Sequence, residues 1–145
     1  MREGIQSLFA ELGEAACLAL CICELGKPGL TEGEALSLII EGIRRGYIKY
    51  DEDNRDNPDN CFVADRDGLM NLVTGERGWT STKEKADYLI KPRERVIEGW
   101  EWKEFCKNKL ITHQHFKLES WNPIRNSLTV KNGKIESLRV FRKAA

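Results

Sequence analysis

Residues 15–23 read AACLALCIC and form the longest uninterrupted apolar run of the chain. Its nine residues are too few to cross a membrane, for which a helix needs about 20. Glu3, Glu11 and Glu14 precede the run, where a secretion signal requires positive charge, and no small-residue cleavage site follows it. We therefore predict a buried helix from about Glu14 to Leu25 in a cytoplasmic protein.

Further helix signals lie on both sides of this run. Apolar residues at positions 5, 8, 9 and 12 recur with helical spacing before it. After it, GKPG at residues 26–29 is a helix stop. Thr31 and Glu34 then have the spacing of a capping box, which predicts the start of another helix. A short helix capped by an aspartate is predicted at about residues 65–74.

The second half of the chain has the alternating pattern of strands. Residues 96–102 and 111–119 each predict a strand. Asn132-Gly133 stands between residues 128–130 and 135–141, and Asn-Gly is a strong signal for a two-residue hairpin turn. We therefore expect these last two segments to pair as a hairpin.

The order of these elements predicts the fold class. Helices over residues 1–75, followed mainly by strands over residues 78–143, indicate an α+β protein with N-terminal helices packed on a C-terminal antiparallel sheet. A length of 145 residues and a mass of 16.6 kDa suit a single domain that covers residues 1–145.

Charge and cysteine content restrict the partners and the compartment. The 23 basic and 23 acidic residues cancel, whereas proteins that bind duplex nucleic acid usually carry a basic field. We expect neither nucleic acid nor a membrane surface as partner; the oligomeric state is left open.

Five cysteines, three of them within residues 17–23, do not suit a disulfide framework and predict reduced thiols. The acidic segment 51–60 lacks the glycine and glutamate of a calcium loop and predicts a simple loop.

The two histidines are the main candidates for chemistry. His113 and His115 lie two residues apart on a predicted strand and share a face. They could be half of a metal site, one could be a general base, or both could be solvated surface residues. The cysteines at 17, 21 and 23 do not have the spacing of a zinc knuckle. The residue types of a thiol–imidazole–amide site are present in order: cysteines on an early helix, then His115, then Asn122.

A resemblance adds to this interpretation. The short helix, the break and the buried Ala/Leu-rich helix, followed much later by HFKLESWNP at residues 115–123, resemble the papain-like cysteine peptidase superfamily. The branch most similar is the bacteriocin leader-peptidase type with its small bacterial relatives. Residues 126–141 resemble the ending of an uncharacterised, often prophage-associated family in the same superfamily.

The resemblance implies roles for particular residues. His115 would be the general base, Asn122 would orient it, and Gln6 would donate to the oxyanion. An aromatic residue beside the asparagine, here Trp121, often shields the pair from water in this superfamily. The nucleophile position falls on Gly13, which has no side chain, and Cys17 one turn later is the nearest substitute.

Three functions follow as expectations. The first is a degenerate papain-like protein, inactive because of Gly13, with a groove for a peptide or a peptidoglycan-like fragment. The second is an active thiol hydrolase of peptide or amide bonds that uses Cys17, His115 and Asn122. The third is a metal-binding domain built on His113 and His115 with a cysteine. The first two require no cofactor or metal.

Overall fold

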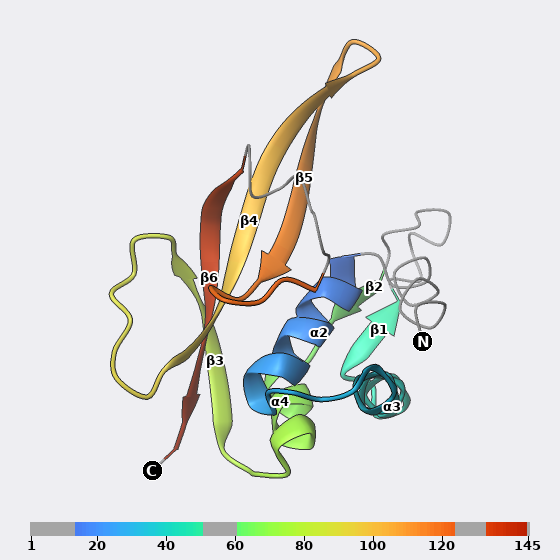
Figure 1. Cartoon of the computed structure of the whole chain (residues 1–145), viewed down its shortest axis with the longest axis vertical. Helices are drawn as coiled ribbons and strands as arrows, with labels where there is room; N and C mark the ends of the chain where they lie inside the picture. Colours follow the sequence, from blue (N-terminus) through green and yellow to red (C-terminus); the bar gives the residue numbers. More distant parts are fainter. Residues whose placement is uncertain (1–13, 51–60, 124–132, 145) are drawn as a thin grey trace.

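The computed structural model describes residues 14–50, 61–123 and 133–144 (Figure 1). This part has an α+β fold in which the helices lie together on one side of an antiparallel sheet, as the element order predicts. In chain order the elements are α2 (Glu14–Gly26), α3 (Glu32–Arg44), β1 (Ile48–Tyr50), β2 (Cys61–Val63), α4 (Arg66–Thr74), β3 (Trp79–Lys85), β4 (Arg95–Cys106), β5 (Lys109–Lys117) and β6 (Lys134–Lys143).

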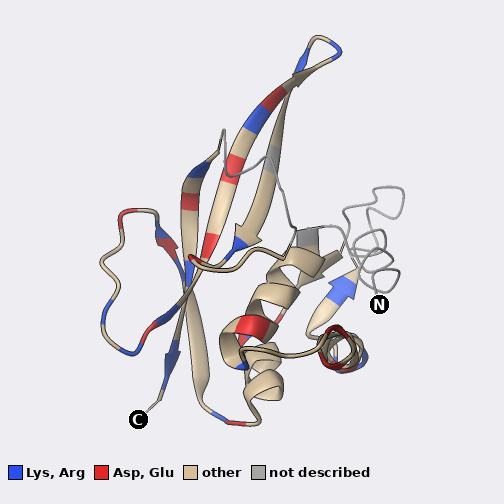
Figure 2. Ribbon diagram, in the orientation of Figure 1, with Lys and Arg blue, Asp and Glu red and all other residues tan. Residues whose placement is uncertain are grey.

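Helix α2 occupies the centre of the molecule. Every residue from 15 to 23 is buried, with exposed fractions between 0 and 8%. The helix contacts β5 and β4 of the sheet as well as α3 and α4 (Figure 1). Figure 2 shows almost no charge along it, as expected for a helix that is apolar on all sides. No helix in the described ranges is long and apolar enough to span a bilayer.

Helices α3 and α4 begin at the caps that the sequence predicts. The Thr31 hydroxyl accepts a hydrogen bond from the Glu34 N–H at 3.2 Å, and the Glu34 carboxylate accepts one from the Thr31 N–H at 3.2 Å. Asp65 rather than Asp67 caps α4. Gly75 ends α4 with φ +70°, a left-handed conformation that favours glycine.

The main sheet has the strand order β3-β6-β4-β5, and all neighbours are antiparallel. Strand β6 is therefore central, between β3 and β4. The partner that we expected for it in a hairpin, residues 128–130, lies outside the described residues. Along Ser137–Phe141 both edges of β6 are already paired, with β3 and with β4. Because a strand has only two edges, further pairing of β6 is possible only outside this stretch, and the expected hairpin with residues 128–130 stays a prediction.

A hairpin that the sequence analysis missed joins β4 to β5. Its turn is Lys107-Asn108, with φ values of +49° and +64°, which is the conformation of a two-residue hairpin turn. Strand β6 supports β4 only as far as Glu101. Beyond that point β4 and β5 form a two-stranded arm that projects from the body (Figure 1). Near its tip Phe105 lies opposite Leu110, and the two are 71% and 60% exposed.

The N-terminal half is not purely helical, which corrects the prediction for residues 1–75. Strands β1 and β2 form a small antiparallel ribbon in which Ile48 and Cys61 are buried. Each strand has three residues, too short for an alternating pattern to be recognised. The helix predicted around residues 5–12 and the loop predicted at 51–60 lie outside the described residues.

The capping box offers a direct test of how α3 is held. Replacing Thr31 by Ala removes the hydroxyl that accepts from the Glu34 N–H, so we expect a loss of about 1 kcal/mol in the free energy of unfolding. Urea denaturation measures this loss. Ser37→Ala is the matched control, because Ser37 is an exposed residue within the same helix and alanine is at least as favourable there. Equal losses in the two variants would contradict the assigned cap.

Candidate functional site

The structure brings His115 and Asn122 together. His115 lies near the end of β5 and is only 2% exposed. Its Nε2 atom is 2.7 Å from Oδ1 of Asn122. A tight turn makes this contact possible: the Leu118 N–H donates to the Trp121 carbonyl at 2.8 Å, which reverses the chain directly after the strand. Two residues seven positions apart thereby become hydrogen-bonded neighbours.

The hydrogen bond fixes the state of the imidazole ring. The Asn122 atom in contact is the amide oxygen, which can only accept a hydrogen bond. Nε2 of His115 must therefore carry the proton. In the neutral ring the lone pair then lies on Nδ1, and this nitrogen is the one that can take up a proton. Asn122 thus acts as a positioning residue for a ring whose basic nitrogen is defined.

The surroundings of the ring favour its neutral form. Burial lowers the pKa of His115 below its usual value; the hydrogen bond from its ring to Asn122 acts in the opposite direction, and the nearby positive charge of Lys117 lowers the pKa further. The Lys117 ammonium is fixed by the Glu98 carboxylate at 3.1 Å and lies 5.4 Å from the centre of the Trp100 ring. A neutral imidazole at neutral pH is able to act as a base.

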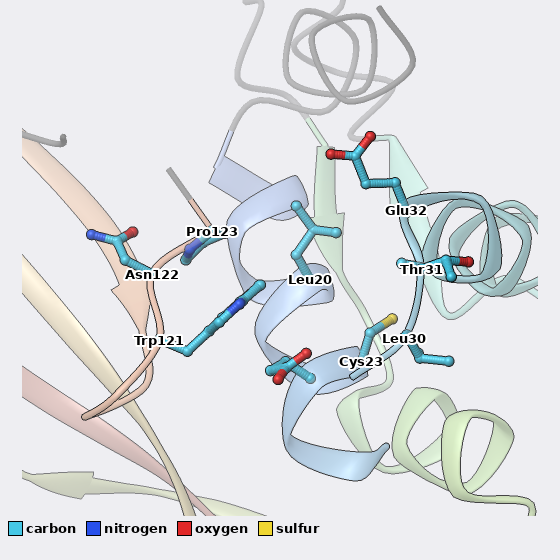
Figure 3. A pocket seen from close by; sticks show the side chains of 10 residues that line it. Leu20, Cys23, Leu30, Thr31, Glu32, Trp121, Asn122 and Pro123 are labelled. Atoms are coloured by element: carbon cyan, nitrogen blue, oxygen red, sulfur yellow. The ribbon is translucent and has the colours of Figure 1, made fainter. Parts of the chain in front are cut away.

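The pair adjoins the central helix. Strand β5 contacts α2, and the segment Trp121–Pro123 lines a cavity together with Leu20 and Cys23 of α2. In Figure 3 the Trp121 side chain points toward α2, whereas the Asn122 side chain points the other way, toward the sheet. Trp121 packs against the hydrophobic core. Its ring therefore belongs to the interface with α2 and is not directed at the amide of Asn122.

The thiols of α2 are poorly suited to nucleophilic chemistry. Cys17 lies in the first turn of the described helix and is 4% exposed. Burial, followed by the effect of neighbouring Cys17, raises the pKa of the Cys21 thiol well above its usual value. Burial and the charge of Glu24 raise the pKa of Cys23 to about 12. Because the thiolate is the reactive form, Cys21 and Cys23 are inert packing residues.

Other candidates from the sequence are only partly visible. Gln6 and Gly13 lie outside the described residues, as does the side chain of His113, whose backbone pairs with Trp102. Within the described ranges no three His, Cys, Asp or Glu side chains come close enough together to hold a metal ion. The sequence analysis missed Lys117, although its position two residues after His115 on a strand places it on the same face.

Comparison with known proteins adds no relative. No protein-family model matches the chain, and neither a curated protein nor a solved structure is significantly similar to it. The site must therefore be interpreted from its own geometry and chemistry.

The state of His115 can be measured by NMR. We expect its pKa below the ordinary value of about 6.5 and the Nε2–H tautomer in the neutral ring. In Asn122→Ala the pKa should fall further, because the bond that favours the protonated ring is lost. Removing the partner of a buried imidazole should also cost about 1–3 kcal/mol of stability. The chain has two histidines, so the signal that remains in His113→Gln is that of His115.

The lowered pKa of His115 determines how the folding stability changes with pH. The folded state binds the proton of His115 less readily than the unfolded state does, so this residue favours folding above the unfolded pKa of about 6.5. Its contribution is lost as the pH falls from that value through the folded pKa. A His115 pKa above the unfolded value, or one unchanged in Asn122→Ala, would contradict the assigned environment.

Proposed function

We propose that this chain is a degenerate papain-like cysteine peptidase-like protein. It keeps an oriented base beside a hydrophobic helix, has lost the nucleophile, and binds a peptide or a cell-wall fragment. The observation that carries the proposal is the buried hydrogen bond of 2.7 Å between Nε2 of His115 and Oδ1 of Asn122. The resemblance of residues 115–123 and 126–141 to bacterial and prophage-associated members of that superfamily supports it.

The pair has the two properties that thiol-dependent catalysis requires of a base. An amide holds the ring in one tautomer, and the basic nitrogen Nδ1 is the one not used by that amide. In an active relative, such a nitrogen takes the proton from a thiol, the thiolate attacks a carbonyl carbon, and the same proton is then given to the leaving amine. The residue that would supply the thiol is the one this chain lacks, because the aligned position holds Gly13.

The active alternative, with Cys17 as nucleophile, is less well supported. Cys17 is almost completely buried within α2, where a substrate carbonyl would have to displace core residues to reach its sulfur. The alternative of a metal site on His113 and His115 is weaker still. The His115 ring is buried and its Nε2 already bonds to Asn122, and the described residues hold no cluster of metal-binding side chains.

Restoring the nucleophile tests the proposal. We expect Gly13→Cys, made in a Cys106→Ser background to remove the exposed thiol, to alkylate with iodoacetamide at neutral pH at least ~10-fold faster than a free thiol, because an adjacent base raises the thiolate fraction. The rate should fall to that of a free thiol when His115→Gln is added. Peptide mapping identifies the modified residue, and the pH profile of the rate gives the pKa of the introduced thiol.

A neighbouring position provides the matched control. Glu14→Cys in the same background places a thiol one residue later, so it measures any general effect of this helix end. Circular dichroism confirms that each variant retains its fold. If the introduced thiol in Gly13→Cys reacts no faster than the one in Glu14→Cys, or is indifferent to His115→Gln, the proposed function is wrong.

The unmodified protein distinguishes the degenerate protein from the active alternative. We expect Cys17 to react more slowly than Cys106, since Cys17 is buried and Cys106 is exposed. Mass spectrometry after brief alkylation gives both rates in one sample, and full alkylation in urea confirms that all five cysteines are detected. Cys17 labelling that exceeds Cys106 labelling and disappears in His115→Gln would instead establish the active hydrolase.

A further inference from the structure

A cavity lies beside Asn122, the hydrogen-bond partner of His115. It is enclosed by α2, by the chain that enters α3, and by the segment Trp121–Pro123 (Figure 3). Its volume is about 270 Å³, slightly below the range of about 300–1,000 Å³ found for small-molecule sites. The cavity therefore has room for one side chain rather than for a cofactor or a large ligand.

The charge of the cavity wall has one sign. Glu24 and Glu32 are the charged residues of the lining, and no Lys, Arg or His of the described chain joins them. Among the described residues, the Glu24 carboxylate accepts a hydrogen bond only from the Gly29 N–H, and that bond is long at 3.4 Å. Neither carboxylate forms an ion pair with a described residue. Two unneutralised carboxylates favour a cation and disfavour an anion.

An aromatic ring completes the wall. Trp121 lines the cavity, and an indole face attracts a cation within about 6 Å of its centre. Two other indoles of this chain already hold cations: Arg95 lies 4.9 Å from the centre of the Trp79 ring, and Lys117 lies over Trp100. In the described part of the chain, Trp121 has no such partner. Although the ring packs against the core on one side, it also lines the cavity, where a cation from outside could contact it.

Part of the wall is apolar and suits the stem of a long basic side chain. Leu20 and Leu30 line the cavity beside the two carboxylates. Lys and Arg bury their methylene groups along apolar surface while the charged end reaches polar groups. A purely apolar side chain would cover the carboxylates without pairing them, which costs free energy. A metal ion is not favoured either, because no three metal-binding side chains converge in the described residues.

We propose that this cavity binds the cationic end of a lysine or arginine side chain of a peptide, between Trp121 and the carboxylates of Glu24 and Glu32. This inference rests on the proposed function, since Asn122 both lines the cavity and bonds to His115. A basic side chain seated here would place the adjoining peptide backbone beside the segment Trp121–Pro123, which carries the partner of His115. The cavity would thus select basic sequences for the groove.

The test uses small probes and the unmodified full chain. Nα-acetyl-lysine N-methylamide and its arginine counterpart are titrated while the indole N–H signal of Trp121, assigned with Trp121→Phe, is followed by NMR. The norleucine counterpart, which lacks the charge, is the matched ligand control. We expect the basic probes to shift the Trp121 signal and to bind at least ~10-fold more tightly than norleucine does. Added salt should weaken their binding, because the carboxylates are near the surface.

Variants of Glu24 and Glu32 test whether their negative charges bind the basic side chain. The double change Glu24→Gln and Glu32→Gln should weaken lysine binding at least ~10-fold while keeping oxygens that accept hydrogen bonds, and each single change should have a smaller effect. Glu84→Gln is the matched control, because Glu84 is a partly buried residue of β3 that does not line the cavity. Equal binding of norleucine and lysine, no shift of the Trp121 signal, or unchanged lysine binding in the double variant would each overturn the inference.

The results also separate this inference from the proposed function. If Gly13→Cys becomes reactive but the lysine probe does not bind, the inference fails and the proposed function stands. If the lysine probe binds as expected but Gly13→Cys gains no reactivity that depends on His115, the proposed function fails, and the cavity is a cation site in a protein of another kind.

Discussion

The burial of residues 15–23 of α2 on all sides is the constraint on which the rest of the structure depends. A helix that is apolar on all sides must be covered on all sides, and no single neighbour can do this. The sheet covers it through β4 and β5, and α3 and α4 cover it elsewhere. Small residues permit the close approach: a Cβ on Gly26 would come within 2.9 Å of the Val73 side chain of α4. The elements that meet around α2 also bring the segment after β5 next to it.

The arrangement of the site follows from that packing. Because β5 lies against α2, the chain that leaves β5 has little room and turns back at once between Leu118 and Trp121. After this turn, neighbouring side chains of the segment Trp121–Pro123 point in different directions. Trp121 and Pro123 point toward the helix, and Asn122 points toward the sheet (Figure 3), where it meets His115. A seven-residue separation between base and amide, short for the superfamily that the sequence resembles, is therefore sufficient to bring them into contact.

Local signals in the sequence predicted local structure well. The capping box at Thr31, the aspartate cap of α4 and the extent of α2 all depend on neighbouring residues, and all are confirmed. The strand order was not predictable, because pairing depends on residues far apart in the sequence. The contact between His115 and Asn122 was expected from resemblance. The cavity was not, because Glu24 and Trp121 come from distant parts of the chain.

The arm formed by β4 and β5 has a consequence for how the stability of this protein is measured. Past Glu101 no described strand other than β5 pairs with β4, and an isolated two-stranded ribbon is marginally stable in water. The arm can therefore melt at lower temperature than the layers around α2. Tryptophan fluorescence would average both regions, since Trp102 lies on the arm and Trp79 in the core. A single midpoint from such a signal would describe neither of the two cooperative units.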